Sequence, residues 1–335
     1  MEYIIDLNNY HSKLSIRETE TAIKCIKDYF EVALAEKLKL MRVSAPLFVQ
    51  TESGLNDNLN GVERPVSFDT LEGGIHCEIV HSLAKWKRMA LKRYSFSIGE
   101  GLYTDMNAIR RDEEVDNLHS IYVDQWDWEK IIPKSDRTID TLQSIVRDIY
   151  DVIKATQVMV QSRYNQLALS LPEDITFVTT QELEDRWPNY TPKERENAIT
   201  REHGAIFLMQ IGGLLSSGSV HDGRAPDYDD WDLNGDILIY YPLIDGAMEL
   251  SSMGIRVDAD ALRRQLEIRN CMERAEMPFH KSLLKGELPQ TIGGGIGQSR
   301  LCMLLLQKAH IGEVQSSVWP QSTISYCQDN NISLL

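Results

Sequence analysis

The sequence predicts an α+β protein with a mixed, largely antiparallel sheet flanked by helices. Strand-like segments neither alternate strictly with helical segments nor gather at one end of the chain. The strongest strand candidates, at residues 118–129 and 236–254, adjoin turn-rich segments. Together these two observations favour antiparallel pairing over a doubly wound sheet. With 335 residues, 42% of them hydrophobic, the chain can bury a substantial core, and we expect residues 1–335 to form a single domain.

The elements of the first half begin with a long amphipathic helix, predicted at residues 15–40. The residues SIRE offer a capping box, and apolar side chains recur at helical spacing after it. Residues 42–50 are predicted to be a strand in which Pro46 indicates an edge or a bulge. The elements expected next are strands at 66–70 and 75–82, a helix at 82–93, a charged loop at 110–117 and a strand at 118–129.

The second half is predicted to contain further strands between helices. A helix is expected at residues 138–166, and a long polar loop at 216–235. Short apolar runs predict strands, and two helices close the chain: strands at 174–180, 205–211, 236–242 and 247–257, and helices at 258–268 and 297–308.

Charge and cysteine content exclude several classes of protein. The net charge of −15 argues against a nucleic-acid partner, because such binding rests largely on Lys and Arg neutralising phosphates. The net charge does not exclude small anionic substrates. The five cysteines are scattered and lack metal-ligand spacing, which argues against a disulfide framework or a structural zinc site. No signal or membrane-spanning pattern is recognisable, so we expect a soluble, cytoplasmic protein with no membrane partner.

The segment TIGGGIGQSRL, residues 291–301, is the most unusual motif. It lacks the lysine of a P-loop, and Gln298 stands where a dinucleotide fingerprint needs its third glycine. We interpret the glycines as letting the backbone pass close under a flat ligand. Arg300 then rises from the first helical turn to hold phosphate oxygens. The alternative is a tight turn with a solvated arginine.

A second constellation lies on the strand predicted at residues 118–129. Side chains alternate along a strand, so Gln125 and Asp127 project from the same face. Polar groups amid Ile, Tyr and Trp are costly to bury unless they bind a ligand or form a structural hydrogen-bond network. Arg110 stands at a strand-to-loop junction, from which it can reach a nucleotide's α-phosphate.

These motifs together resemble a known family. Arg110, the acidic loop, the strand ending at Gln125–Glu129 and the distant Arg300 resemble motifs two and three of the class II aminoacyl-tRNA synthetase fold. The first helix and the strand with Pro46 resemble motif one, which forms the dimer. Longer segments resemble the ammonia-dependent asparagine synthetase family, the aspartate–ammonia ligases, along nearly the whole chain: DNLNG, HSLAKWKR, GEGLYTDM, HSIYVDQWDWE, RAPDYDDW, LNGDIL, ELSSMGIRVD and PQTIGGGIGQSRL.

The resemblance implies a single catalytic domain that converts L-aspartate and ammonia to L-asparagine, AMP and diphosphate through a β-aspartyl-adenylate, using ATP and Mg²⁺. It also implies a homodimer formed through the N-terminal helix and strand. Two rivals remain: a tRNA-charging enzyme, which normally adds an anticodon-binding domain, and a catalytically silent regulatory relative. Glutamine is not expected as the nitrogen donor, because position 2 is Glu and no glutaminase-like segment is recognisable.

The resemblance also implies the ATP and metal residues. Arg110 contacts the α-phosphate, with Arg111 as the alternative, and Arg300 contacts the ATP tail or the aspartate carboxylate. Asp236 and Glu249 hold magnesium; read alone, they are an ion pair or turn contacts. The remaining residues expected at the ATP site are Ser120, Val123, Leu250 and Gly295.

Aspartate and ammonia are expected to meet a third group of residues. Lys87 and Arg300 face the aspartate carboxylates, while Gln125 and Asp127 face its amino end, with Ser252 nearby. Asp57, otherwise a turn aspartate, is the base that takes a proton from ammonium. The acidic segment 224–232 either assists magnesium, covers ATP or is a solvated turn.

Overall fold

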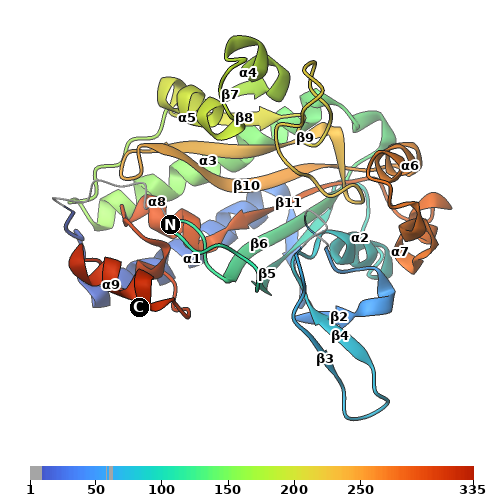
Figure 1. The fold of residues 1–335 in the computed structure, drawn as a ribbon, viewed down its shortest axis with the longest axis horizontal. Helices are drawn as coiled ribbons and strands as arrows, with labels where there is room; N and C mark the ends of the chain where they lie inside the picture. The colour runs from blue at the N-terminus through green and yellow to red at the C-terminus, as the bar shows by residue number, and fades with distance from the viewer. Residues whose placement is uncertain (1–9, 58, 60–62) are drawn as a thin grey trace.

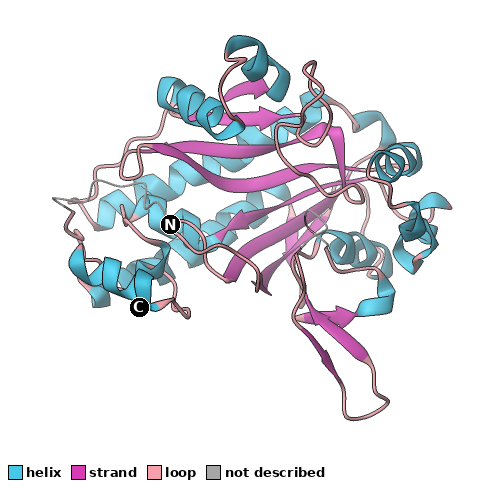
Figure 2. Ribbon diagram, viewed as in Figure 1, coloured by secondary structure: helices cyan, strands magenta, loops and turns pink. Residues whose placement is uncertain are grey.

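A computed structural model describes residues 10–57, 59 and 63–335, and its centre is an eight-stranded sheet (Figures 1 and 2). The strand order is β1-β5-β6-β11-β10-β9-β8-β7. All neighbours are antiparallel except the pairs β1–β5 and β7–β8 at the two edges, so the predicted α+β class is confirmed. The strands are β1 (Leu40–Arg42), β5 (Gly101–Ile109), β6 (Tyr122–Ile131), β7 (Thr176–Thr179), β8 (Ala205–Met209), β9 (Asp229–Tyr241), β10 (Gly246–Arg256) and β11 (Thr291–Gly297).

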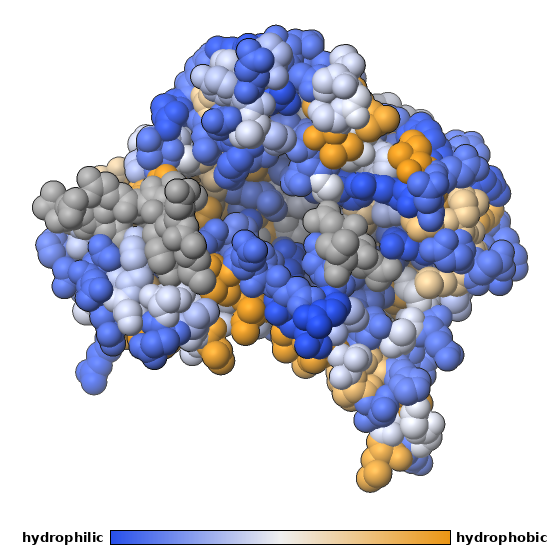
Figure 3. Space-filling model, viewed as in Figure 1, coloured by the Kyte–Doolittle hydropathy of each residue, from blue (hydrophilic) through white to orange (hydrophobic). Residues whose placement is uncertain are grey.

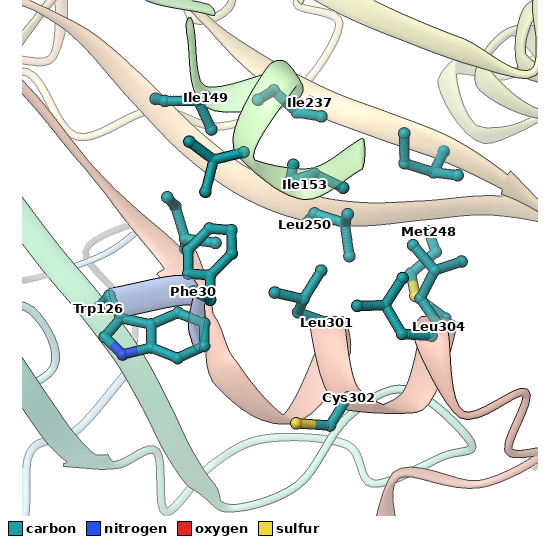
Figure 4. Close-up of a cluster of buried hydrophobic side chains, with 14 of the residues drawn as sticks. Phe30, Trp126, Ile149, Ile153, Ile237, Met248, Leu250, Leu301, Cys302 and Leu304 are labelled. Atoms are coloured by element: carbon teal, nitrogen blue, oxygen red, sulfur yellow. The ribbon is translucent and has the colours of Figure 1, made fainter. Parts of the chain in front are cut away.

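One face of this sheet is covered by α1 (Ile16–Leu38), α3 (Ile139–Arg163) and α8 (Gln298–Leu305). The capping box predicted at Ser15 is present at the start of α1. Phe30 of α1 packs on Trp126 of β6 with ring centroids 4.6 Å apart, and Leu301 and Leu304 of α8 join the same core (Figure 4). Trp126 therefore points into this core, and Gln125 and Asp127, one residue away on either side, project from the opposite face.

The opposite face carries the smaller elements. Helix α2 (Ala84–Arg93) lies over β6 and β11, and α6 (Ala259–Ile268) packs with α7 (Pro278–Leu284) in a second apolar cluster. A three-stranded sheet of β2 (Phe48–Gln50), β4 (His76–Ile79) and β3 (Ser67–Asp69) projects from the body as an arm (Figure 1). Its tip carries exposed Leu71, while the rest of the face in Figure 3 is mainly hydrophilic.

Two strand predictions were wrong in detail. The predicted strand 42–50 is interrupted: Arg42 ends β1 of the large sheet, and only Phe48–Gln50 form β2, which belongs to the small sheet. Pro46 lies in the link between them, because proline has no N–H to donate to a ladder. The polar loop predicted up to residue 235 ends earlier, since β9 begins at Asp229. Asp229 and Asp230 fit inside the fold because Arg256 and Arg137 pair with them.

The tight turn that was the alternative interpretation of the glycine-rich segment is wrong. Residues 291–297 form β11, a central strand between β6 and β10, and α8 begins directly after it. Four helices were not predicted from the sequence, and they are α4 (Thr180–Arg186), α5 (Pro192–His203), α7 and α9 (Gln321–Asp329). Within the described ranges, none of the helices combines the length and the apolar character needed to cross a membrane.

Candidate active site

A pocket of about 430 Å³ opens on the sheet face opposite α1 and α3. Its floor comes from β6, β10 and β11, and its walls from the segment after β5, the start of α8 and the loop around Arg224. Most of the residues that the sequence assigns to the site line this pocket. They are Asp57, Lys87, Arg110, Ser120, Val123, Gln125, Asp127, Glu249, Leu250, Ser252, Gly295 and Arg300.

Arg110 and Arg300, although far apart in sequence, line this same pocket. Arg110 directly follows β5, and its Nη1 lies 3.9 Å from the Glu113 carboxylate. Arg300, in the first turn of α8, donates from Nη1 to the Glu249 backbone oxygen at 3.0 Å and lies 3.7 Å from its carboxylate. A guanidinium has five N–H donors, so these contacts leave donors of both arginines for an anion. Arg111 lines the pocket as well.

Gln125 and Asp127 share one face of β6, as predicted, and glycine makes room for them. A Cβ on Gly295 would lie 2.7 Å from Asp127 Oδ1 and closer still to the amide oxygen of Gln125. Asp127 accepts a bond from the backbone N of Leu83 and lies 3.5 Å from Lys87 Nζ. The Asp127 side chain is therefore partly engaged by protein groups, and Gln125 has the more exposed side chain of the two.

Lys87 is a buried cation at the base of the pocket. Its Nζ donates to the Gly294 carbonyl at 3.0 Å and lies near Asp127. Burial lowers the pKa of Lys87, while Asp127 opposes that shift. Lys85 and Arg88 of the same helix are buried too.

The two carboxylates assigned to a metal differ in position. Glu249 lines the pocket, whereas Asp236 lies behind the lining, paired in register with Ser252 and 3.0 Å from Arg224 Nη2. The pKa of Asp236 is raised to about 7, because burial and the nearby Glu249 carboxylate together outweigh the lowering by Arg224. Across the described part of the chain, no three His, Cys, Asp or Glu side chains gather in a way that could hold a metal ion. Any magnesium here needs ligands from a substrate as well.

Asp57 is buried at the pocket wall, with only 2% of its surface exposed. Its Oδ1 accepts from the backbone N of Leu59 at 2.8 Å. The motif DNLNG starts at Asp57, and its residues 58, 60 and 61 lie outside the described ranges.

The acidic segment 224–232 is not a solvated turn. Asp227 is fully buried, 3.2 Å from Lys85 Nζ and 3.0 Å from His280 Nε2. Burial raises the pKa of Asp227, but Lys85, the hydrogen bond with His280 and Arg274 outweigh it and hold the pKa below its usual range. The segment is thereby fixed against α2 and α7, and Arg224 and Tyr228 are held at the pocket.

Sequence reasoning missed a buried charge network beneath the pocket. Arg256 of β10 donates to Glu129 of β6 at 2.8 Å and pairs with Asp229, while Arg224 lies between Asp229 and Asp236. Strand alternation alone places Glu129 on the face of Gln125 and Asp127, so that signal was available. Arg256, a charge at the end of an apolar strand, was the second available signal.

Comparisons with solved structures identify the fold. The chain is similar to asparaginyl-tRNA synthetase from Entamoeba histolytica in complex with asparaginyl-adenylate, with a TM-score of 0.63 and 14% identity, over 90% of this chain and 66% of that one. It is also similar to asparaginyl-tRNA synthetase from Pyrococcus horikoshii complexed with asparaginyl-adenylate, with a TM-score of 0.65, 14% identity and coverage of 90% and 70%. The fold is that of the class II aminoacyl-tRNA synthetase catalytic domain.

Sequence comparisons extend the likeness to whole proteins. The chain is 62% identical to an aspartate–ammonia ligase from Clostridium perfringens and 63% identical to one from Ruminiclostridium cellulolyticum, covering 100% of this chain and of each relative. A family model described as aspartate–ammonia ligase matches residues 17–331. With a full-length match at this identity, the chain belongs to the aspartate–ammonia ligase family.

Proposed function

We propose that this pocket makes L-asparagine in two steps through a β-aspartyl-adenylate. Membership of the family supports the overall reaction, the ligation of aspartate and ammonia. In the first step a β-carboxylate oxygen attacks the α-phosphorus of ATP and diphosphate leaves. In the second step ammonia attacks the activated carbonyl carbon, and AMP leaves with one of the original carboxylate oxygens.

One observation carries the first step: Arg110 and Arg300, which are far apart in the sequence, line one pocket. Phosphoryl transfer is accelerated mainly by positioning and by positive charge around the phosphorus. We assign Arg110 to the α-phosphate and Arg300 to the ATP tail or the aspartate carboxylate, with Ser120, Val123, Leu250 and Gly295 lining the ATP side.

Aspartate is proposed to bind over β6 and β10. Lys87 supplies positive charge for a carboxylate, Gln125 and Asp127 accept from the α-ammonium group, and Ser252 lies alongside. The cluster of Lys87 and Asp127, 3.5 Å apart and buried, supports this, since a zwitterion needs both signs of charge within a few ångströms.

Magnesium is proposed to bind with ATP at Asp236 and Glu249. The raised pKa of Asp236 near a second carboxylate supports a cation there, because a positive ion relieves the repulsion between them. Two protein carboxylates plus substrate phosphates are a common arrangement for Mg²⁺. When bound, the ion neutralises phosphate charge during transfer.

Asp57 is proposed as the base of the second step. Ammonium must lose a proton before its nitrogen can attack, and a carboxylate in the pocket wall can accept it. The burial of Asp57 in that wall supports this role.

We further propose that residues 1–335 act as one catalytic domain in a cytoplasmic homodimer that binds no nucleic acid. The five cysteines, all unpaired, support a reducing location. Exposed apolar side chains on α1 and the edge strand β1, Val32 and Met41 among them, support a dimer surface there. Val32→Glu is expected to shift the mass measured by light scattering from dimer to monomer.

An isotope experiment tests the adenylate. Purified protein is incubated with ATP, Mg²⁺, ammonium chloride and aspartate labelled with ¹⁸O in the β-carboxylate. The proposal requires the label in AMP, whereas activation through an acyl phosphate instead places it in inorganic phosphate beside ADP. Adding tRNA must leave the rate unchanged, because stimulation by tRNA indicates a charging enzyme.

A further inference from the structure

Several buried polar atoms of the pocket lining have no hydrogen-bond partner among the described residues, and two of them belong to residues that contact each other. One is Oδ2 of Asp57 and the other is Nε2 of His81. Both residues line the pocket, and their side chains are almost completely buried, with 2% and 1% exposure. Leaving a buried polar atom without a partner is costly, so such atoms in a native protein point to a ligand.

The hydrogen bonds of His81 determine its tautomer. Its Nδ1 lies 3.0 Å from the backbone oxygen of Asp57, and a carbonyl oxygen can only accept. The Nδ1 atom therefore carries a hydrogen, and when the ring binds only that one, Nε2 presents a lone pair. His81 thus offers the pocket an acceptor. Asp57 Oδ2 offers a second one, although the Asp57 carboxylate also interacts with the side chain of Tyr228.

Asn56 fixes these two residues relative to each other. Its side-chain oxygen accepts from the backbone N of Asp57 and from that of His81, both at 2.9 Å. Its amide nitrogen donates to Glu78 and to the carbonyl of Ile79 at the end of β4. The acceptors are therefore held by a hydrogen-bonded frame rather than by a free loop.

We propose that His81 Nε2 and Asp57 Oδ2 form the ammonium subsite of the enzyme. The inference rests on the proposed function and deepens it by adding His81, which the sequence did not indicate. Ammonium carries four N–H donors and no acceptor, which matches a pair of lone-pair acceptors. It transfers one proton to the Asp57 carboxylate and becomes ammonia, and the lone pair that this frees first faces the new carboxyl O–H. Ammonia then turns about its hydrogen bond to His81, and the lone pair attacks the adenylate carbonyl carbon.

The test compares His81→Asn with His81→Gln. Asparagine can keep the donor at the Nδ1 position, which holds Asp57, but loses the pocket acceptor. Glutamine can keep an acceptor near the Nε2 position but loses the bond to Asp57. We expect His81→Asn to raise the KM for ammonium chloride roughly tenfold to a hundredfold, the effect of losing one buried hydrogen bond. His81→Gln is expected to stay closer to the wild type.

Aspartate-dependent exchange between ATP and diphosphate is the internal control, because it reports only the first step. The exchange rate and the KM for aspartate must be unchanged in His81→Asn. A rise in the aspartate KM instead assigns the two acceptors to the substrate's own α-ammonium group and overturns the proposal. Equal losses in both variants, or a loss of exchange, also overturn it, since they indicate a purely structural histidine. Absence of exchange in the wild type instead refutes the adenylate itself.

Discussion

Strands β6 and β11 lie side by side and contribute to the pocket in opposite ways. On the pocket face β6 presents Gln125, Asp127 and Glu129, whereas β11 presents glycines at 293, 295 and 297 and a side chain only at Thr291. In register, Gly293 lies opposite Glu129 and Gly295 opposite Asp127. Side chains directly opposite each other on neighbouring strands normally fill the space between them. The glycines leave that space to the polar side chains of β6. Strand β11 therefore contributes to the pocket because it has no side chains at these positions.

Replacing Gly293 by alanine is expected to have the largest effect. The added methyl would lie 2.7 Å from Arg256 Nη2 and closer to Glu129 Oε2, two fully buried, paired groups that cannot move into solvent. Because separating a buried ion pair leaves uncompensated charge, we expect a loss of about 3–5 kcal/mol in the free energy of unfolding, measured in urea. Gly213→Ala is the matched control, since its Cβ meets nothing within 4 Å. Equal stability of the two variants contradicts this account.

Gly295→Ala is expected to reduce activity more than stability. Its methyl would displace Gln125 and Asp127, which face the pocket instead of the buried charge network. We expect kcat/KM for aspartate to fall about a hundredfold, a typical loss for one displaced polar contact in an active site. Steady-state kinetics with varied aspartate measure this, and a variant with unchanged kinetics excludes close packing of Gln125 on Gly295.

A double variant locates the source of that loss. Gln125→Ala removes the side chain that crowds Gly295 most closely, so adding Gly295→Ala to it should cost less than it costs alone. We expect a coupling of about 1–2 kcal/mol in a double-mutant cycle on kcat/KM, within the range for residues in contact. Strict additivity indicates that the methyl acts elsewhere.

The smallest effect concerns pH and Glu129. Burial alone raises the pKa of this carboxyl, but Arg256 and Lys87 outweigh it and hold the pKa below the usual 4.5. The unfolded chain therefore binds the proton more readily, and the stability contributed by ionised Glu129 is present above pH 4.5 and lost as pH falls below it. In Glu129→Gln, the free energy of unfolding measured in urea is expected to fall less between neutral and acid pH than in the wild type. An unchanged fall assigns this pH dependence to other carboxylates.

The sequence predicted the polar strand of this pair much better than the glycine strand. Alternation of Gln125 and Asp127 with Trp126 follows from the geometry of one strand, so local sequence was sufficient. The residues of β11 have low strand propensity, and only pairing on both sides with β6 and β10 makes them a strand. A turn was therefore the natural local prediction.

Charge pairing between distant elements was equally difficult to predict from the local sequence. Asp227 and Asp229 belong to a run of acidic residues typical of a solvated loop, and they are buried only because Lys85, His280 and Arg256 reach them from other elements. His81 was not predicted for the same reason. That its Nε2 atom lacks a partner follows only from the fold, which places Asn56 and Asp57 beside it. Arg110 and Arg300 were found through family resemblance, and the fold brings both to one pocket.

The position of β11 also has a consequence for synthesis of the chain. This strand is the last of the large sheet to leave the ribosome, yet it lies between β6 and β10 near the centre. Until it emerges, a nascent chain carries two incomplete half-sheets, each with an open edge that can pair with a neighbour. Chaperone demand during translation should therefore peak late, and ribosome-bound chains stalled before residue 291 should aggregate more readily than chains released at full length.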